Sequence, residues 1–273
     1  MPIDHVLKLY SETIQSSYLH YGFWDNPETI QVERMTLQDF KDAQVRYIEN
    51  LASYIPDEVN SILDVGCGIG GNTDFLLNEG YKLETLSPDD FQRSIIGQKF
   101  DNKIPFHHCK FEQFKINRKF DLILESESAC YINISKGFSK ARDVLKMGGY
   151  LLASDYFVYF NDNSKSPHLR SSHDLEKYME SAKEHGFELI KEYDQTKNTM
   201  LTLDYGKHLI ERFINPTMDY AIFSGKKNYP FVTMVMKKLF KSKFDSKKDQ
   251  LELLDSNLFR KYRKYMIFLF KKV

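Results

Sequence analysis

The chain has 273 residues, of which 42% are hydrophobic and 14% are aromatic. This composition suffices for a packed core and excludes global disorder. The net charge is zero but unevenly distributed: residues 226–273 carry 14 Lys and Arg against 4 Asp and Glu, whereas the first 225 residues carry 24 against 34. The basic C-terminal region can attract a membrane surface or another anionic ligand, or it can simply keep the chain soluble.

The rest of the composition predicts a soluble cytoplasmic protein. Three cysteines, Cys67, Cys109 and Cys130, lie far apart, which is typical of a reducing compartment rather than of a disulfide framework. The N-terminus is too polar for a signal peptide, and no apolar run reaches membrane-spanning length. No metal-ligand spacing is present, so no metal site is expected.

Helical periodicity comes first along the chain. An amphipathic helix is predicted over Ile3–Tyr18 and a second over Thr36–Tyr54, which Pro56 closes. Beyond them strands and helices alternate, with a helix after Ser87-Pro88-Asp89 and a turn at Gly148-Gly149 before the fifth strand. This alternation predicts an α/β fold with a doubly wound, mostly parallel sheet. The strands are expected at 61–65, 81–86, 104–109, 120–124, 150–154, 187–193 and 265–270.

We expect a single domain with additions at both ends of a core. Residues 1–55 form an N-terminal helical extension or cap, 56–200 the cofactor-binding core, 201–262 a helical lid insertion and 263–273 the last core strand. The extension and the insertion do not follow the strand–helix alternation, so both are expected to cover the site. The rings and thioethers of the lid favour an apolar or adaptable pocket. They are Phe213, Met218, Tyr220, Phe223, Tyr229, Phe231, Met234 and Met236.

The most informative segment is Leu63-Asp64-Val65-Gly66-Cys67-Gly68-Ile69-Gly70-Gly71. It joins a predicted buried strand to an amphipathic segment, the arrangement that holds a nucleotide-like cofactor at a strand's carboxyl end. The glycines let the backbone approach the ligand, and the Asp64 carboxylate suits a cationic group better than a pyrophosphate.

The same glycines formally satisfy G-x-G-x-x-G, so a nicotinamide- or flavin-dependent oxidoreductase is an alternative. Asp64 and the additional Gly70 argue against it. So does a chain that ends in a predicted edge strand, Tyr265 to Phe270, rather than in a second nucleotide-binding half.

The glycine segment resembles motif I of the class I S-adenosylmethionine-dependent methyltransferases. Further segments resemble, in order, the branch with the tocopherol, sterol, mycolic acid and sarcosine methyltransferases. They are Tyr18-Leu19-His20-Tyr21-Gly22-Phe23-Trp24-Asp25, Thr85-Leu86-Ser87-Pro88, Phe111-Glu112-Gln113-Phe114 and Glu125-Ser126-Glu127-Ser128-Ala129-Cys130-Tyr131. The resemblance implies a seven-stranded sheet in the order 3-2-1-4-5-7-6 with its last-entering strand antiparallel. It also implies S-adenosylmethionine as the cofactor.

The resemblance also implies which residues meet this cofactor. Asp64, Gly66, Gly68 and Gly70 would hold the methionine part, while Thr85, Leu86 and Ser87 would lie by the ribose and adenine. Phe111 would pack on the adenine plane with Glu112 at its edge, and Ser126 would reach the methionine end. Tyr21 belongs to an aromatic set that can close over the sulfonium, because ring faces attract cations. Plain structural roles are the alternatives: Phe111 as core, Ser87 as a helix cap and the aromatic set as a hydrophobic clasp.

Methyl transfer from a sulfonium mainly requires alignment and exclusion of water. Where the acceptor needs a base, that base must lie near the carboxyl ends of the fourth and fifth strands or on the lid. Glu127 is the first choice, with Tyr131 and His20 next, and His168 and His173 as further candidates. Glu127 could equally hold an amine or stabilise a carbocation.

The function predicted is therefore methylation of a small-molecule or lipid-like acceptor, with carbon, nitrogen and oxygen all open as the atom methylated. A non-catalytic or nucleic-acid-binding protein that retained the fold is the third hypothesis, motivated by the basic C-terminal region. Against it, no Asn/Asp-Pro-Pro-aromatic motif follows the fourth strand.

Overall fold

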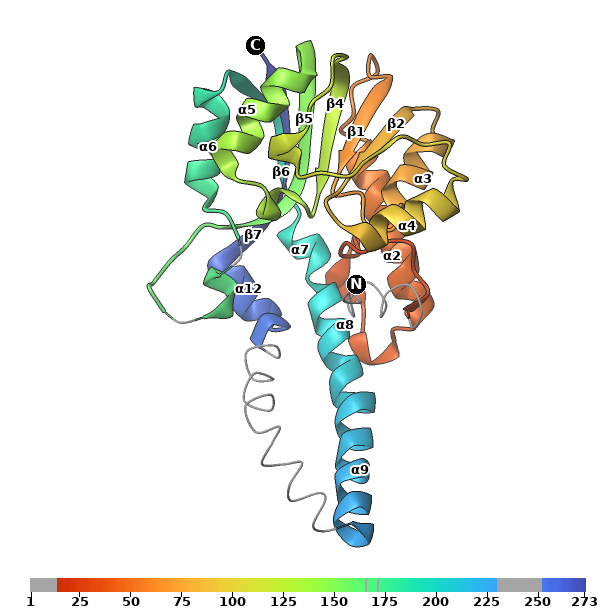
Figure 1. The fold of residues 1–273 in the computed structure, drawn as a ribbon. Coiled ribbons are helices and arrows are strands. Elements are labelled where there is room, and N and C mark those ends of the chain that lie inside the picture. Colours follow the sequence, from red (N-terminus) through yellow and green to blue (C-terminus); the bar gives the residue numbers. More distant parts are fainter. Residues whose placement is uncertain (1–13, 165, 171, 230–251) are drawn as a thin grey trace.

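The computed structural model describes residues 14–164, 166–170, 172–229 and 252–273. In these ranges seven strands form one sheet in the order β3-β2-β1-β4-β5-β7-β6 (Figure 1), the order that the resemblance implies. Neighbours from β3 to β5 pair in parallel, and β7 is antiparallel to both β5 and β6. The strands are β1 (Ser61–Val65), β2 (Lys82–Leu86), β3 (Phe106–His107), β4 (Phe120–Ser126), β5 (Leu145–Val158), β6 (Phe187–Asp194) and β7 (Arg263–Lys272).

Side-chain caps define several helix starts. Thr36 closes a capping box with Asp39 before α2, and Asp174 accepts a hydrogen bond from the backbone of the first turn of α6. Asp89, not Ser87, is the N-cap of α4, because the Asp89 side chain accepts from the Gln92 amide. The helices are α2 (Leu37–Ala52), α3 (Gly71–Asn78), α4 (Asp90–Lys99), α5 (Ile134–Val144), α6 (Leu175–Glu184), α7 (Thr196–Thr199), α8 (Leu201–Leu209), α9 (Asn215–Asn228) and α12 (Ser256–Tyr262).

Three further expectations need correction. Most of the predicted helix Ile3–Tyr18 lies outside the described residues, but residues 15–18 are not helical, and Gln15 has a φ of 54°. The turn at Gly148-Gly149 lies within β5, which begins at Leu145 and shifts register against β4 there. The last strand, β7, is not an edge strand: it lies between β5 and β6 and is almost wholly buried. Its near-continuous apolar run is typical of a strand covered on both faces.

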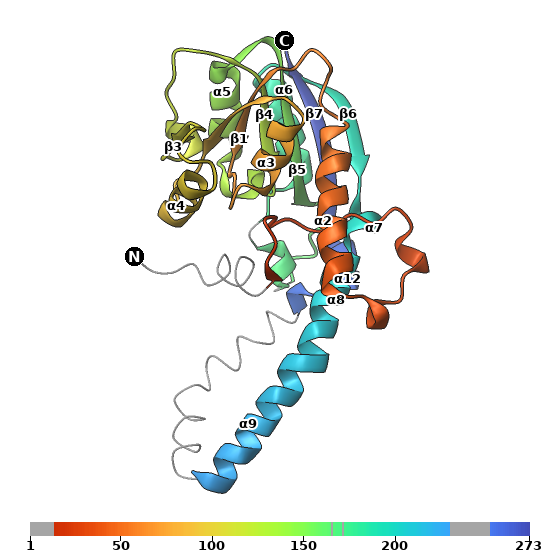
Figure 2. The ribbon, with the colours of Figure 1, turned by 90° about the vertical axis from the view of Figure 1, so that its right-hand side faces the viewer.

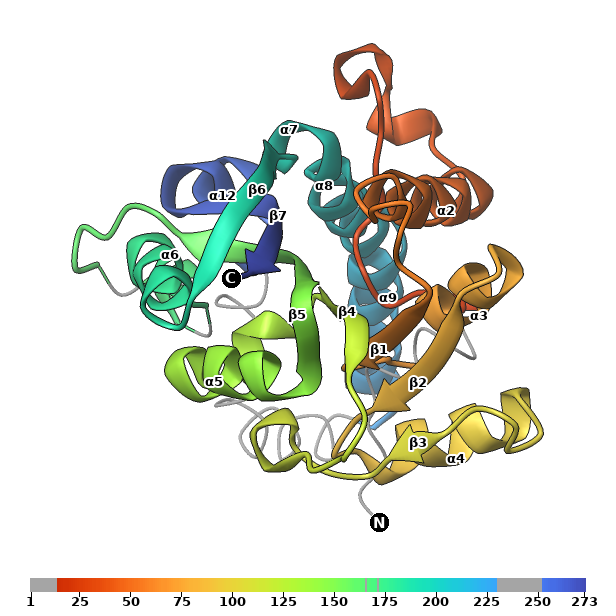
Figure 3. The ribbon, with the colours of Figure 1, turned by 90° about the horizontal axis from the view of Figure 1, so that it is seen from above.

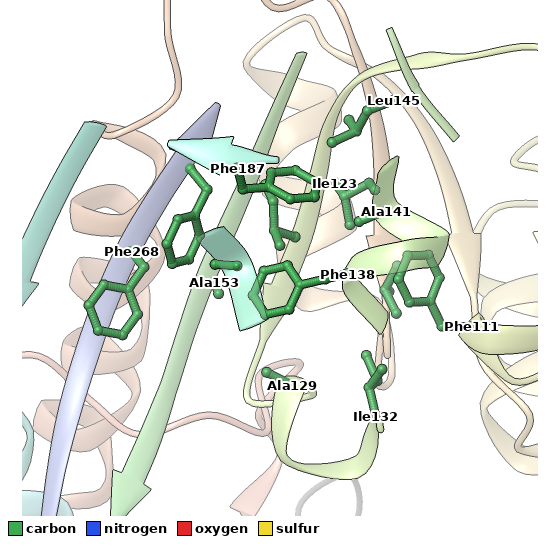
Figure 4. Close-up of a cluster of buried hydrophobic side chains, with 14 of the residues drawn as sticks. Phe111, Ile123, Ala129, Ile132, Phe138, Ala141, Leu145, Ala153, Phe187 and Phe268 are labelled. Atoms are coloured by element: carbon green, nitrogen blue, oxygen red, sulfur yellow. The ribbon is translucent and has the colours of Figure 1, made fainter. Parts of the chain in front are cut away.

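The core has a layer on each face of the sheet. Helices α5 and α6 cover one face, and α2 and α3 lie on the other (Figure 3). Because side chains alternate along a strand, Ile123 of β4 joins the cluster under α5, with Phe138 and Phe268 (Figure 4), while Leu122 joins the cluster under α2 with Tyr47. Each such large apolar side chain stabilises the fold by about 1.5–3 kcal/mol on burial.

A long helical arm leaves the body. Helix α8, a π-helical segment (Ile210–Ile214) and α9 run on from one another, and α9 extends away from the sheet (Figures 1 and 2). Only the root of the arm is packed: Leu201 and Tyr205 of α8 join Trp24 and Phe40 in a small apolar cluster. The predicted insertion is helical in its described part. Its helix α9 projects from the body, whereas Phe259 and Tyr262 of α12 are buried in it. Phe231, Met234 and Met236 lie outside the described residues.

Candidate cofactor and acceptor site

A cavity of about 630 Å³ lies at the carboxyl ends of β1, β2 and β4. Residues 17–20, which precede α2, form one of its walls, so the N-terminal extension contributes to the site. None of the described residues of the arm borders it. Most of the predicted site residues do, including the three preferred as catalytic. They are His20, Gly66, Gly68, Leu86, Ser87, Phe111, Glu112, Ser126, Glu127 and Tyr131.

The loop between β1 and α3 requires its glycines. Gly66, Gly68 and Gly70 have φ values of 75°, 56° and 80°, which L side chains rarely adopt. A Cβ on Gly66 would collide with the Ser128 side chain, and one on Gly68 would lie 2.9 Å from Leu19 Cδ1. The loop therefore presents bare backbone to the cavity, as a backbone-bound ligand needs.

Tyr21 does not border the cavity, and three further predicted cofactor residues lie behind its wall. The buried Asp64 carboxylate accepts a 2.7 Å hydrogen bond from Thr73 Oγ1, and burial raises the pKa of Asp64 to about 6. Thr85 Oγ1 donates to the Pro105 carbonyl at 3.1 Å, and Gly70 is the N-cap of α3. In this structure they hold the glycine loop and the end of β2 in place rather than facing the cavity.

Residues on the predicted adenosine side already have protein partners. Phe111 is buried in the core cluster under α5, as the alternative role anticipates, yet it also borders the cavity. Glu112 Oε1 accepts from the Asn133 amide at 3.0 Å, and Ser87 Oγ accepts from the Asp89 amide at 3.2 Å. Ser126 Oγ differs, because it is buried and has no hydrogen-bond partner among the described residues. A buried polar atom left without a partner at a cavity wall fits a polar group of a ligand.

Glu127 follows β4 in a left-handed conformation with φ 52°, and its amide donates to the Ser154 carbonyl at 2.8 Å. Its Oε1 accepts from the Tyr21 amide at 2.7 Å and from the Tyr265 hydroxyl at 2.5 Å. Desolvation raises the pKa of Glu127 to about 8. The two hydrogen bonds lower this pKa, and the charge of Asp155 raises it by a smaller amount. The side chain is thus held in one orientation and is protonated over much of the neutral range.

A chain of hydroxyls leads to Glu127. Gln195 Nε2 donates to Ser154 Oγ at 2.8 Å, Ser154 Oγ lies 2.6 Å from the Tyr47 hydroxyl, and that hydroxyl lies 3.0 Å from Tyr265. Because Tyr265 donates to Glu127, the Tyr47 hydroxyl must donate to Tyr265 and accept from Ser154. None of these four was a predicted site residue, because none belongs to a recognisable motif and they meet only in the fold.

His20 is buried in the cavity wall. Its ring stacks on Tyr47 with centroids 4.0 Å apart, its Nδ1 lies 2.8 Å from the Tyr21 carbonyl oxygen, and its Nε2 lies 3.0 Å from Asn72 Oδ1. Burial lowers the pKa of His20 to about 4, so the ring is neutral and carries one N–H, which it can donate to one of these two oxygens. Both ring nitrogens therefore face protein acceptors. Tyr131, by contrast, is 82% exposed at the cavity mouth.

The two remaining histidine candidates do not border the cavity. His173 Nε2 lies 2.9 Å from the Ala129 carbonyl and 2.8 Å from the Ile132 carbonyl, and so fixes the segment after β4. His168 Nε2 donates to the Glu252 carbonyl at 3.0 Å. In the described ranges no group of three His, Cys, Asp or Glu side chains could hold a metal ion.

Comparison with known proteins identifies the family. Residues 38–196, more than half of the chain, match the model of a methyltransferase domain. A probable tocopherol O-methyltransferase of Oryza sativa subsp. japonica, a chloroplastic protein, is 32% identical over 131 residues, which are 43% of this chain and 34% of the plant protein. Phosphoethanolamine N-methyltransferase 3 of Arabidopsis thaliana is 26% identical over 167 residues, which are 55% of this chain and 33% of that protein. The match thus spans about a third of the length of these relatives.

Solved structures share the fold over nearly the whole chain. A putative sarcosine dimethylglycine methyltransferase from Galdieria sulphuraria superposes with a TM-score of 0.73 at 17% identity, covering 98% of each chain. Geranyl diphosphate C-methyltransferase from Streptomyces coelicolor A3(2) gives 0.72 at 13% identity, covering all of this chain and 94% of the other. Neither the family match nor these folds support the oxidoreductase or the non-catalytic alternative. The chain belongs to the S-adenosylmethionine-dependent methyltransferases.

Proposed function

We propose that this protein transfers the methyl group of S-adenosylmethionine to a small-molecule acceptor with an apolar, lipid-like body. The observation that carries the proposal is the continuity of the cavity, which runs from the bare glycine loop at Gly66 and Gly68 to the carboxyl of Glu127. One end suits a cofactor held by backbone, and the other presents a titratable group where an acceptor would lie.

The residues present fit the cofactor. When bound, S-adenosylmethionine supplies an electrophilic methyl group on a sulfonium. The backbone of Gly66 and Gly68 and the unpaired hydroxyl of Ser126 would hold its methionine part, and Leu86, Ser87, Phe111 and Glu112 would surround its adenosine. Asp64 would act from behind the loop, through Thr73.

Glu127 would act as the base for the acceptor. A positive charge placed near a carboxyl favours its ionised form and lowers its pKa. The proton held by Glu127 in the free protein would therefore leave as the cationic cofactor enters, and the carboxylate would then accept a proton from the acceptor. Tyr265 and the Tyr21 amide fix the orientation of Glu127 for this transfer.

The cavity lining favours an apolar acceptor. Leu19, Tyr131 and Ile132 line the same cavity as Glu127. Side chains of this kind bind a hydrocarbon or aromatic body. Among the related proteins named above, the tocopherol O-methyltransferase and the geranyl diphosphate C-methyltransferase have acceptors of this kind in their names.

The decisive experiment has two steps. Titration calorimetry with S-adenosylhomocysteine and with NAD⁺ should show binding of the first alone; tight binding of NAD⁺ without S-adenosylhomocysteine would refute the proposal. Transfer of a labelled methyl group is then measured to a methylated phenol with a prenyl tail, to phosphoethanolamine and to a prenyl diphosphate. Glu127→Gln should lower turnover with cofactor affinity retained. The matched control Glu112→Gln should instead weaken cofactor binding.

We also place the protein in the cytoplasm. The three cysteines are free thiols, as a reducing compartment favours. Within the part of the chain that is described, no helix combines the length and the apolar character needed to cross a bilayer. Cell fractionation tests this location, and recovery of the protein in an organelle lumen would refute it.

A further inference from the structure

Exposed aromatic side chains are gathered at one end of the molecule. All seven that the described ranges expose lie on segments that leave the carboxyl edge of the sheet: after β4, after β5 and on the arm. At the opposite end the exposed large apolar residues are Met147 and Val273. Large apolar groups concentrated on one exposed face mark an interaction surface. The seven are Tyr131, Tyr159, Phe160, Phe213, Tyr220, Phe223 and Tyr229.

The arm carries the largest share of them. Phe213, Tyr220 and Phe223 are 56%, 71% and 63% exposed, and their spacing of seven and three residues places them on the same side of the helix. No residue of α9 is buried. From Leu201 to Asn228 the arm has a length of roughly 40 Å at 1.5 Å per residue, so its tip stands clear of the body (Figure 2).

The tip of the arm carries two lysines. Lys226 and Lys227 end α9 and are exposed, and Lys227 falls on the same side of the helix as Tyr220 and Phe223. By sequence, residues 226–251 contain eight Lys and two Asp. Aromatic rings bordered by lysines match the interface of an anionic membrane, where rings sit at the headgroup level and ammonium groups meet lipid phosphates.

The root of the arm lies beside the proposed catalytic centre. Thr202 Oγ1 in α8 accepts a 2.9 Å hydrogen bond from the Gly22 amide, and the neighbouring Tyr21 amide donates to Glu127. Tyr131 at the cavity mouth belongs to the same set of exposed rings. A surface that held the arm would therefore face the end of the molecule on which the cavity opens.

We propose that Phe213, Tyr220, Phe223, Lys226 and Lys227 form a docking surface for an anionic lipid bilayer. Docking goes beyond the proposed methyl transfer and does not depend on it, although a lipid-like acceptor would be met at the same surface. The arm lies in the interface plane and the protein stays peripheral to the bilayer.

The test is co-sedimentation of the full chain with vesicles of phosphatidylcholine alone and of phosphatidylcholine mixed with phosphatidylglycerol. We expect binding to the mixed vesicles, weaker binding to the neutral ones, and loss of binding at high salt. Replacing Phe213, Tyr220 and Phe223 together by Ser should weaken binding by about tenfold or more, because the rings supply the apolar contact. Lys226→Glu with Lys227→Glu should weaken it by at least roughly fivefold per lysine.

The matched control is Leu189→Ser with Ile190→Ser, two exposed apolar residues on the edge strand β6, which should leave vesicle binding unchanged. Circular dichroism verifies that each variant is folded, and none of the substituted arm residues is buried. Absence of binding to the mixed vesicles, or undiminished binding by the triple Ser variant, overturns the proposal. The proposal is also overturned if the native chain binds no vesicles but forms a dimer, and the triple variant is a monomer. The surface would then be assigned to a second copy of the chain.

Discussion

The hydroxyl of Tyr265 provides the sharpest test of the proposed mechanism. In Tyr265→Phe the phenyl ring keeps its packing, but Glu127 loses the 2.5 Å hydrogen bond that stabilises its ionised form. A hydrogen bond to a charged group contributes about 1.5–3 kcal/mol. Since 1.36 kcal/mol corresponds to one pKa unit, the pKa of Glu127 in the free protein should rise from about 8 by about one to two units.

The assay is the pH dependence of kcat/KM, which reports ionisations of the free enzyme. A base must be deprotonated to act, so the rate of the native protein should rise with pH through about 8. In Tyr265→Phe this rise should move to higher pH by about one to two units, with activity about 10- to 100-fold lower at pH 7 and largely recovered at high pH. For kcat the rise should lie at lower pH, because the bound sulfonium favours the carboxylate.

Tyr193→Phe is the matched control. Its hydroxyl donates to Asn198 Oδ1 at 3.0 Å and does not take part in the chain that ends on Glu127, so its profile should coincide with that of the native protein. A Tyr265→Phe profile that falls uniformly, without displacement along the pH axis, would refute the assignment of Glu127 as the base.

Three further predictions concern the loop, Asp64 and buried acids. Gly66→Ala should weaken S-adenosylhomocysteine binding at least about tenfold by calorimetry. The control is Gly80→Ala, where φ is 93° but a Cβ meets nothing within 4 Å, and this variant should lose only about 1–2 kcal/mol of unfolding free energy. Equal effects of the two variants on binding would contradict the steric account. Asp64→Ala should abolish cofactor binding in a folded protein, and unchanged affinity would remove Asp64 from the site. Burial and the nearby Asp155 raise the pKa of Glu125 from 4.5 to about 8. Between these two pH values Glu125 is protonated in the native state and ionised in the unfolded state, so the free energy of unfolding should fall as the pH rises from about 4.5 to 8. In Glu125→Gln the thermal midpoint should fall less steeply with pH, whereas the control Glu188→Gln, at an exposed position, should leave the slope unchanged. An unaltered slope in Glu125→Gln would refute the linkage.

Local sequence patterns were enough to predict most of the sheet. Ser61–Val65 was predicted to the residue, because an apolar run bounded by a polar start and a glycine turn has few alternatives. Strands β5 and β7 were both predicted too short at each end, because pairing with neighbouring strands extends them beyond their apolar centres. The buried position of β7 was missed in the residue pattern, although the family resemblance implied it, because strand order depends on contacts between residues far apart in the chain.

The sequence by itself determined the glycine loop, because a left-handed backbone permits few residue types, and its ordered motifs indicated the cofactor class through the family resemblance. The role of the acid after β4 stays a prediction. Only the tertiary structure decided what surrounds Glu127. Five residues from separate segments meet there only when the chain folds: Tyr21, Tyr47, Ser154, Gln195 and Tyr265. It also decided that α9 projects from the body, because an exposed helix and a covering lid have the same periodicity and differ only in what packs against them.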